Sequence, residues 1–402
     1  MAAVDLICRT NYPLIMAHTE LEMFRRLAGC LAAVALSSAA CGPPLFRSSD
    51  SPITMSRPEQ AELSTPPPVQ LAPPAHIARN ANALFVNLQH DMPAPENKIR
   101  VSTTHDVGFN GADDIVAVLV DHDASDTVLV SLKNPGVITR RSWPGTGIVN
   151  CAKILRSGSV VRRCTDADGV SELFVEDVAD GSQRVLPGKD LGQGPVLMDV
   201  SAASGQAVCC DFETFSVWNL NAAQSPRKVE KPIGLAPFAI HPHVNIVATG
   251  CPMVGGYYSL STGQQTEDVG VLSSILLGAI AFSPSGKLLA AGGMGQDYHE
   301  RVWIGTFDDS ATVLDVRGTG TRTSWIEFSS SERLVASIDS TSIVSLWDLQ
   351  RKTCACRFVS GEAITGGAAF SADDTRLALG CNSGIKVYRV SNLLGRGLPP
   401  NE

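Results

Sequence analysis

The chain has 402 residues, a formal net charge of −8 from 32 Lys and Arg against 40 Asp and Glu, and 44% hydrophobic residues. This hydrophobic content with only 18% charged residues indicates a folded globular protein and excludes an intrinsically disordered chain. The acidic balance argues against a nucleic-acid-binding protein, because such proteins normally present a basic surface to the phosphates.

Residues 23–40 have the order of parts that is typical of a signal peptide. Arg25 and Arg26 precede a short apolar run, and the small residues of 38–40 follow it. The run is too short for a transmembrane helix. Residues 1–42 are therefore interpreted as a leader that directs export.

Cys41 follows the small residues directly, an arrangement that resembles the lipobox of bacterial lipoproteins. Ser38 stands where that motif usually has Leu, so the match is incomplete. The resemblance implies an exported protein that is periplasmic or anchored to the membrane by a lipid on Cys41. A cytoplasmic protein with an Ala-rich leader is the alternative. Residues 43–80 are rich in Pro and Ser without apolar periodicity, which predicts a flexible linker.

Residues 81–397 repeat one pattern, and residues 398–402 form a short tail. Each copy has an apolar residue at the end of one strand, then a polar turn, then a second apolar strand. Seven copies follow one another at intervals of roughly 40–46 residues. Their apolar residues are Phe109, Ile154, Val200, Ile240, Phe282, Phe328 and Phe370. In six copies an aromatic residue marks the end of a third strand; these are Phe174, Trp218, Tyr258, Trp303, Trp347 and Tyr388.

Trp347 and Asp348 form a literal WD dipeptide, and with the repeat length they make the chain resemble WD40-repeat proteins over roughly residues 82–397. The resemblance implies an all-β fold, a seven-bladed β-propeller of four-stranded antiparallel blades. The last copy has room for three strands only, so we expect the strand within 83–88 to complete the seventh blade and close the ring. Another repeated antiparallel fold, such as a pair of sandwiches, is the alternative.

The chain contains eleven Cys. Four of them share one register of the repeat, at the end of the second strand; these are Cys164, Cys210, Cys251 and Cys381. Equivalent positions on different blades are expected to lie too far apart for a disulfide, so these four are interpreted as small core residues. Cys209 and Cys210 are predicted to lie on opposite faces of their strand. Cys354 and Cys356 are predicted to share one face of an outer strand, without further ligands at metal-binding spacing.

The sequence contains no catalytic or phosphate-binding motif, so no enzyme, cofactor or metal site is predicted. Two groups of carboxylates, expected in loops, could hold a cation or be ordinary solvated turn residues; these are Asp121, Asp123 and Asp126, and Asp166 with Asp168. His241 and His243 flank Pro242 in a predicted tight turn, where they are expected to be structural or to face solvent. Asp339 resembles the WD40 Asp that fixes a turn by hydrogen bonds.

Propellers usually bind ligands on the face formed by two sets of loops, which join the second strand to the third and one blade to the next. Residues expected in these loops give the predicted binding surface; these are Trp143, Asp211, Glu213, Tyr298, His299, Arg322 and Trp325. Trp, Tyr and Arg are frequent anchors of protein interfaces. For Trp325, packing between blades is the alternative.

The sequence therefore predicts a monomeric, non-enzymatic scaffold that binds a protein or peptide partner. The alternative is a propeller enzyme, or a small-ligand or metal binder of the lactonase type, that uses the central channel.

Overall fold

The computed structural model describes residues 84–87 and most of residues 103–394. The gaps in the second range are 111–113, 122–123, 133–137, 143–147, 156, 166–169, 189–196, 212–213, 223, 231–235, 252–253, 296–298, 318–320 and 383. The predicted leader, linker and tail lie outside the described residues, and so does Cys41.

The described strands form seven antiparallel sheets of four strands each, which confirms the predicted seven-bladed β-propeller. Blades 1 and 2 consist of β2 (Thr103–Phe109), β3 (Ile115–Asp121), β4 (Ala124–Val130) and β5 (Ile138–Ser142), then β6 (Ile148–Ile154), β7 (Val160–Thr165), β8 (Ser171–Glu176) and β9 (Gln183–Leu186). Blades 3 and 4 consist of β10 (Leu197–Ser201), β11 (Gln206–Cys210), β12 (Thr214–Asn219) and β13 (Arg227–Glu230), then β14 (Phe238–Ile240), β15 (Ile246–Cys251), β16 (Val254–Ser259) and β17 (Gln265–Asp268).

Blades 5 and 6 consist of β18 (Leu276–Phe282), β19 (Leu288–Met294), β20 (Glu300–Thr306) and β21 (Thr312–Arg317), then β22 (Thr323–Phe328), β23 (Leu334–Asp339), β24 (Ile343–Asp348) and β25 (Thr353–Val359). Blade 7 consists of β26 (Ile364–Phe370), β27 (Arg376–Cys381), β28 (Gly384–Arg389) and the N-terminal strand β1 (Leu84–Asn87). Two short helices accompany the blades, α2 (Gly270–Ser274) before blade 5 and α3 (Val390–Leu393) after β28. Within the described part of the chain, neither helix has the length and apolarity needed to cross a membrane.

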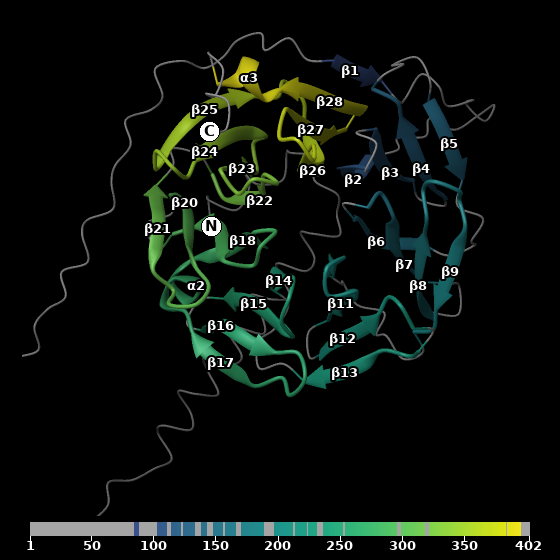
Figure 1. Cartoon of the computed structure of the whole chain (residues 1–402), viewed down its shortest axis with the longest axis horizontal. Coiled ribbons are helices and arrows are strands. Elements are labelled where there is room, and N and C mark those ends of the chain that lie inside the picture. The colour runs from purple at the N-terminus through teal and green to yellow at the C-terminus, as the bar shows by residue number, and fades with distance from the viewer. Residues whose placement is uncertain are drawn as a thin grey trace, which may run out of the picture. The chain divides into compact units, whose positions relative to one another are not determined.

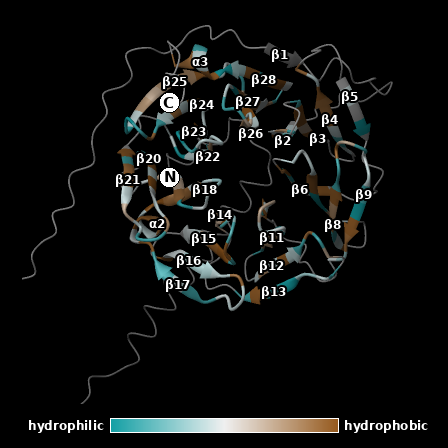
Figure 2. Ribbon diagram, viewed as in Figure 1, coloured by the Kyte–Doolittle hydropathy of each residue, from teal (hydrophilic) through white to brown (hydrophobic). Residues whose placement is uncertain are grey.

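The first strand of each blade faces the centre of the ring. Each of these strands contacts the first strands of both neighbouring blades, and the series returns from β26 to β2. The last strands lie at the outer rim of the ring. Figure 1 shows this for β5, β9, β13, β17, β21 and β25. The rim strand β17 is hydrophilic in Figure 2, and all four of its residues are exposed.

The ring is closed as predicted, because β1 pairs with β28 and becomes the outer strand of blade 7. Asn87 lies opposite Gly384 in this antiparallel pair. On the inner side of the same junction, the Thr104 hydroxyl in blade 1 donates a hydrogen bond of 2.9 Å to the Cys381 carbonyl in blade 7. Blade 7 thus joins the two ends of the propeller sequence in one sheet.

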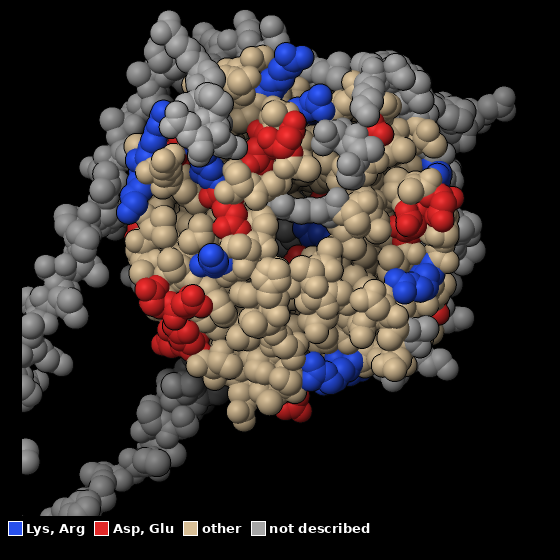
Figure 3. Space-filling view, viewed as in Figure 1, with Lys and Arg blue, Asp and Glu red and all other residues tan. Residues whose placement is uncertain are grey.

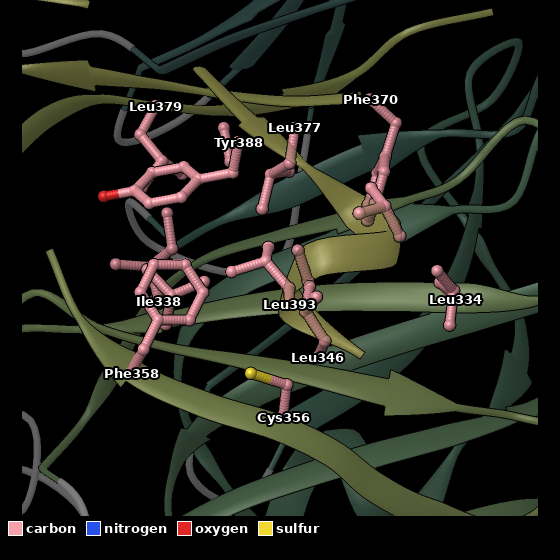
Figure 4. Close-up of a cluster of buried hydrophobic side chains, with 14 of the residues drawn as sticks. Leu334, Ile338, Leu346, Cys356, Phe358, Phe370, Leu377, Leu379, Tyr388 and Leu393 are labelled. Carbon is pink, nitrogen blue, oxygen red and sulfur yellow. The ribbon is translucent and has the colours of Figure 1, made fainter. Parts of the chain in front are cut away.

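The hydrophobic core is divided among the interfaces between blades, because each sheet buries both faces. Figure 4 shows the cluster between blades 6 and 7, where the rings of Phe358 and Tyr388 lie 5.0 Å apart. The aromatic residue of the third strand is buried in five blades; these residues are Trp218, Tyr258, Trp303, Trp347 and Tyr388. Such a side chain loses contact with water only when a neighbouring blade covers it, which explains its place in the repeat.

Polar side chains hold the turns between first and second strands. In blades 5 to 7 a serine hydroxyl accepts a hydrogen bond from a backbone N–H five residues later; the pairs are Ser283 with Leu288, Ser329 with Leu334, and Ser371 with Arg376. These turns are also connected to one another, since Asp374 of blade 7 accepts hydrogen bonds from the backbone N–H groups of Ser330 and Ser331 in blade 6. The predicted polar turn is therefore also a contact between blades.

The cysteines fill core positions. Cys164, Cys210 and Cys381 are buried thiols in the core, as predicted, whereas the side chain of Cys251 lies outside the described residues. The predicted shared face of Cys354 and Cys356 is wrong, because the pairing of β24 with β25 shifts register between Leu346 and Trp347. Cys354 consequently packs against the cluster between blades 5 and 6, and Cys356 against the cluster between blades 6 and 7.

Candidate functional site

The structure describes four of the seven residues predicted to form the binding surface; these are Asp211, His299, Arg322 and Trp325. The other three, Trp143, Glu213 and Tyr298, lie outside the described residues. The four described residues come from blades 3, 5 and 6 or from the loops next to them, at the ends of the strands where blades are joined. Their surroundings differ, so each is considered separately.

Asp211 stabilises its own loop. Its carboxylate accepts hydrogen bonds from the backbone N–H of Thr214 at 2.6 Å and from the Thr214 hydroxyl at 3.0 Å, just before β12 begins. His299 is exposed in the loop that leads into β20, where its carbonyl accepts a hydrogen bond of 2.9 Å from Gly295. Of these two, His299 presents the more accessible side chain.

Arg322 connects blades 5 and 6. It precedes β22, and its Nη2 donates a hydrogen bond of 2.6 Å to the Leu277 carbonyl in β18. Beside it, the buried carboxylate of Glu300 accepts a hydrogen bond from the Thr323 hydroxyl at 3.3 Å and pairs with Arg357 at 3.4 Å. These polar contacts hold the start of β22 in blade 6 against β18 and β20 in blade 5.

Trp325 lies inside β22 and not in a loop, which corrects its expected position. Its Nε1 donates a hydrogen bond of 3.2 Å to the Ala368 carbonyl in β26, so it does pack between blades 6 and 7. The ring covers Gly367, where a Cβ atom would come within 2.3 Å of the ring and where φ is +69°. Gly367 is therefore required both for its backbone conformation and for the space that the indole occupies.

The ammonium group of Lys153 lies over the Trp325 ring, with its Nζ 4.1 Å from the ring centroid. Lys153 belongs to β6 in blade 2, and Trp325 belongs to blade 6. Blades 2 and 6 are not neighbours, so these two side chains meet across the centre of the ring. The distance is that of a cation–π interaction, which grows stronger as water is excluded.

Two carboxylates, one from each blade next to that of Lys153, interact electrostatically with its ammonium group. Asp106 lies in β2 of blade 1, and its Oδ2 accepts a hydrogen bond of 2.8 Å from the backbone N–H of Ile154. Asp199 lies in β10 of blade 3, and its Oδ2 accepts a hydrogen bond of 2.8 Å from the backbone N–H of Ile240. Each acid thus joins its own first strand to the first strand of the next blade.

Burial dominates the electrostatics of both acids. Desolvation raises the pKa of Asp106 to about 6, although the charge of Lys153 and two backbone hydrogen bonds oppose the rise. Desolvation also raises the pKa of Asp199, again against the charge of Lys153. We name the set of Lys153, Trp325, Asp106 and Asp199 the channel cluster. Figure 3 shows a hollow at the centre of the ring with both positively and negatively charged atoms inside it.

The channel cluster was not predicted from the sequence, although one signal was available. Lys153 and Asp199 each directly precede the repeated apolar residue of their copy, Ile154 or Val200, where most copies of the repeat have a small or apolar residue. Asp106 gave a weaker signal, because a register shift between Thr104 and Asp106 changes the direction of the side chains along β2.

The remaining candidates are structural where the structure describes them. His241 is buried, and its Nδ1 accepts hydrogen bonds of 3.1 Å from the backbone N–H groups of His243 and Val244. Asp339 accepts hydrogen bonds from Thr341 and from the backbone N–H of Ile343, which confirms its predicted role in fixing a turn.

Asp121 and Asp126 belong to β3 and β4 and not to a loop, while Asp123, Asp166 and Asp168 lie outside the described residues. Among the side chains that the structure describes, no three of the types His, Cys, Asp and Glu gather as a metal ion would require.

No protein-family model and no curated protein sequence matches the chain. Solved structures do share its fold. One of them is a chain from the crystal structure of the mitotic checkpoint complex, with a TM-score of 0.58 and 13% sequence identity. The match covers 80% of the present chain and 98% of the other. At this identity the similarity establishes the propeller architecture alone.

Proposed function

We propose that the protein is a non-enzymatic propeller scaffold, similar to WD40 proteins, that binds a protein or peptide partner at the channel cluster and the neighbouring loops. The observation that carries the proposal is the pair of Lys153 and Trp325, both half-buried, at the centre of the ring. Tryptophan in well-packed, desolvated positions contributes strongly to the binding energy of many protein interfaces. The propeller chain of similar fold is found in a multi-protein complex, which supports the same role.

The test compares two lysine variants of the full chain. Lys153→Gln changes the channel cluster, and Lys287→Gln is its matched control, because Lys287 is exposed in the turn at the opposite end of the strands of blade 5. Proteins retained from the native host by each tagged variant are quantified by mass spectrometry, and the Kd of the strongest partner is then measured with purified components.

We expect the partner to bind Lys153→Gln at least about 10-fold more weakly than the unchanged protein, and to bind Lys287→Gln as before. Equal retention and equal Kd for both variants would refute binding at the channel cluster. Melting temperatures of both variants, measured in parallel, separate a loss of binding from a loss of folding.

We also propose that the scaffold is exported and tethered to the cell envelope through a lipid on Cys41. The leader pattern of residues 23–40 and the Pro- and Ser-rich residues 43–80 support this arrangement. Cys41→Ser is expected to move the protein from the membrane fraction to the soluble fraction and to remove the acyl mass from its N-terminus. A variant that stays in the membrane fraction would contradict the proposal.

A further inference from the structure

The interface between blades 2 and 3 contains two cysteines from different strands. Cys151 lies in β6, and Cys209 lies in β11. Both belong to the hydrophobic cluster that fills this interface, with 7% and 2% of their surfaces exposed. The two thiols lie near enough for each to shift the pKa of the other.

Strand alternation explains why these two sulfur atoms meet. In β11, Ala207 and Cys209 point toward blade 2, whereas Val208 and Cys210 pack in the cluster between blades 3 and 4. In β6, a register shift between Val149 and Cys151 directs Cys151 toward blade 3. The geometric objection to disulfides between blades applies to equivalent positions, and these two positions are not equivalent, since one is in a first strand and the other in a second.

A buried guanidinium lies beside the pair. Arg163, only 1% exposed, is opposite Cys151 in the adjacent strand β7, and its Nη2 donates a hydrogen bond to the Ser171 hydroxyl at 3.1 Å. The hydrogen bond from Cys209 lowers the pKa of Cys151, and the charge of Arg163 acts in the same direction. Burial raises the pKa of Cys209 well above its ordinary value. Cys151 is therefore the sulfur that loses its proton first.

We propose that Cys151 and Cys209 are an oxidisable pair that forms a disulfide between blades 2 and 3. With hydrogen peroxide as the oxidant, the Cys151 thiolate attacks one peroxide oxygen, the O–O bond breaks, and the products are a sulfenic acid and hydroxide. The Cys209 sulfur then attacks the sulfenic sulfur, the S–O bond breaks, and the hydroxyl leaves as water with the Cys209 proton. Overall, two thiols are oxidised, one peroxide is reduced, and two waters form.

The bond would add a covalent connection between two sheets that pack against each other and share the hydrogen bond of 3.1 Å from Trp218 Nε1 to the Pro187 carbonyl. It closes a loop that runs from the first strand of blade 2 to the second strand of blade 3, and closing a loop of that size restricts the unfolded chain. Oxidation should therefore raise the melting temperature, by roughly 5–10 °C if native geometry is kept. A thiol reductant should reverse the increase.

The test uses the full-length protein, reduced first and then treated with hydrogen peroxide. Remaining thiols are alkylated, and peptides are examined by mass spectrometry without reduction. We expect one cross-linked peptide pair, Cys151 with Cys209, lighter by two hydrogen atoms than the sum of its parts, together with the increase in melting temperature. Cys151→Ser and Cys209→Ser should each abolish both results.

Two cysteines provide matched controls. Cys164 packs toward blade 1, and Cys210 packs toward blade 4, so both are buried but face away from the pair. Cys164→Ser and Cys210→Ser should keep the cross-link and the increase in melting temperature. A cross-link that involves any other cysteine, or oxidation of Cys151 to sulfinic acid without a cross-link in the folded protein, would overturn the proposal.

Discussion

The ammonium group of Lys153 and the indole ring of Trp325 meet across the centre of the propeller, 4.1 Å apart, although their blades are not neighbours. Contacts of neighbouring first strands form the wall of the ring, but this contact crosses the ring. It brings one side chain of blade 2 against one of blade 6, so the energy of the pair can be measured by mutating these two residues.

A double-mutant cycle should measure that energy. We expect Lys153→Met and Trp325→Leu, each measured by urea unfolding, to show a coupling of about 0.5–2 kcal/mol, because the pair is partly desolvated. Trp325→Phe keeps an aromatic face and should retain part of the coupling while losing the hydrogen bond to Ala368. A coupling of zero would mean that the two groups lie together without attracting one another.

Asp106 should make stability fall as the pH rises. Its pKa is about 6 in the fold and 3.8 in a model peptide, so between these values the folded protein holds a proton that the unfolded chain releases. The unfavourable contribution is absent below pH 3.8 and complete above pH 6, where it amounts to about 3 kcal/mol.

Asp106→Asn should remove this dependence while keeping an oxygen that can accept the hydrogen bond from Ile154. Melting temperatures from pH 4 to pH 7 should therefore fall less steeply in the variant than in the unchanged protein. Parallel curves for the two proteins would show that Asp106 does not titrate in this range.

His241 should make the stability of the fold decrease as the pH falls below 6.5, which is opposite in sign to the effect of Asp106. Burial lowers its pKa, its Nδ1 accepts two backbone hydrogen bonds, and its Nε2 lies 3.1 Å from the Gly286 carbonyl. The fold therefore favours neutral imidazole with the proton on Nε2. Its contribution to stability is complete above pH 6.5 and is lost as the pH falls toward the lower pKa of the folded state.

His241→Ser tests this effect, since serine occupies the same position of the turn in blades 5 to 7. The variant should be less stable at pH 7 by about 1–3 kcal/mol, because the imidazole packs at 4.4 Å from the Phe307 ring, but its stability should change less between pH 7 and pH 5. Urea unfolding at the two pH values gives the comparison.

Replacing only one partner of the buried ion pair between Arg162 and Glu176 should strongly lower the free energy of unfolding. The two groups lie 2.6 Å apart with almost no exposure, and Thr127 of blade 1 also donates a hydrogen bond to the Glu176 carboxylate at 2.7 Å. Glu176→Leu removes the carboxylate from a buried guanidinium that keeps its hydrogen bond to the Thr127 hydroxyl, so we expect a loss of about 3–5 kcal/mol in the free energy of unfolding.

Replacing both partners supplies the control. The double variant with Arg162→Met and Glu176→Leu buries no charge at this position and should recover most of the stability that Glu176→Leu loses. If the double variant is as unstable as the single one, the loss comes from packing and not from the unpaired charge.

The architecture could be predicted because it depends on features that recur. Seven polar turns at regular spacing and a third-strand aromatic such as Trp303 or Trp347 are visible without neighbours, and the missing strand of the last copy indicated that β1 closes the ring. These signals are local in sequence, and each copy supports the others.

The site was harder to predict because it depends on relations between blades. Trp325 was expected in a loop, but it lies in a strand beside Gly367, and its partner Lys153 is distant in sequence. Register shifts next to Asp106 and Cys151 change the face of the strand to which these side chains point. A sequence-based prediction that assumes regular alternation of side chains between the two faces of a strand cannot anticipate such shifts. The residues of the site are therefore those that depart from the repeat, and the repeat pattern by itself does not reveal them.

The pairing of β1 with β28 also sets an order in time. β1 is synthesised before every blade, and its partner is made only after the other six blades are complete. Until then the nascent chain carries a strand whose hydrogen-bonding edge has no native partner, and such an edge can pair with another chain. Closure of the ring therefore requires blade 7, and an unpaired β1 edge favours aggregation until that blade has formed.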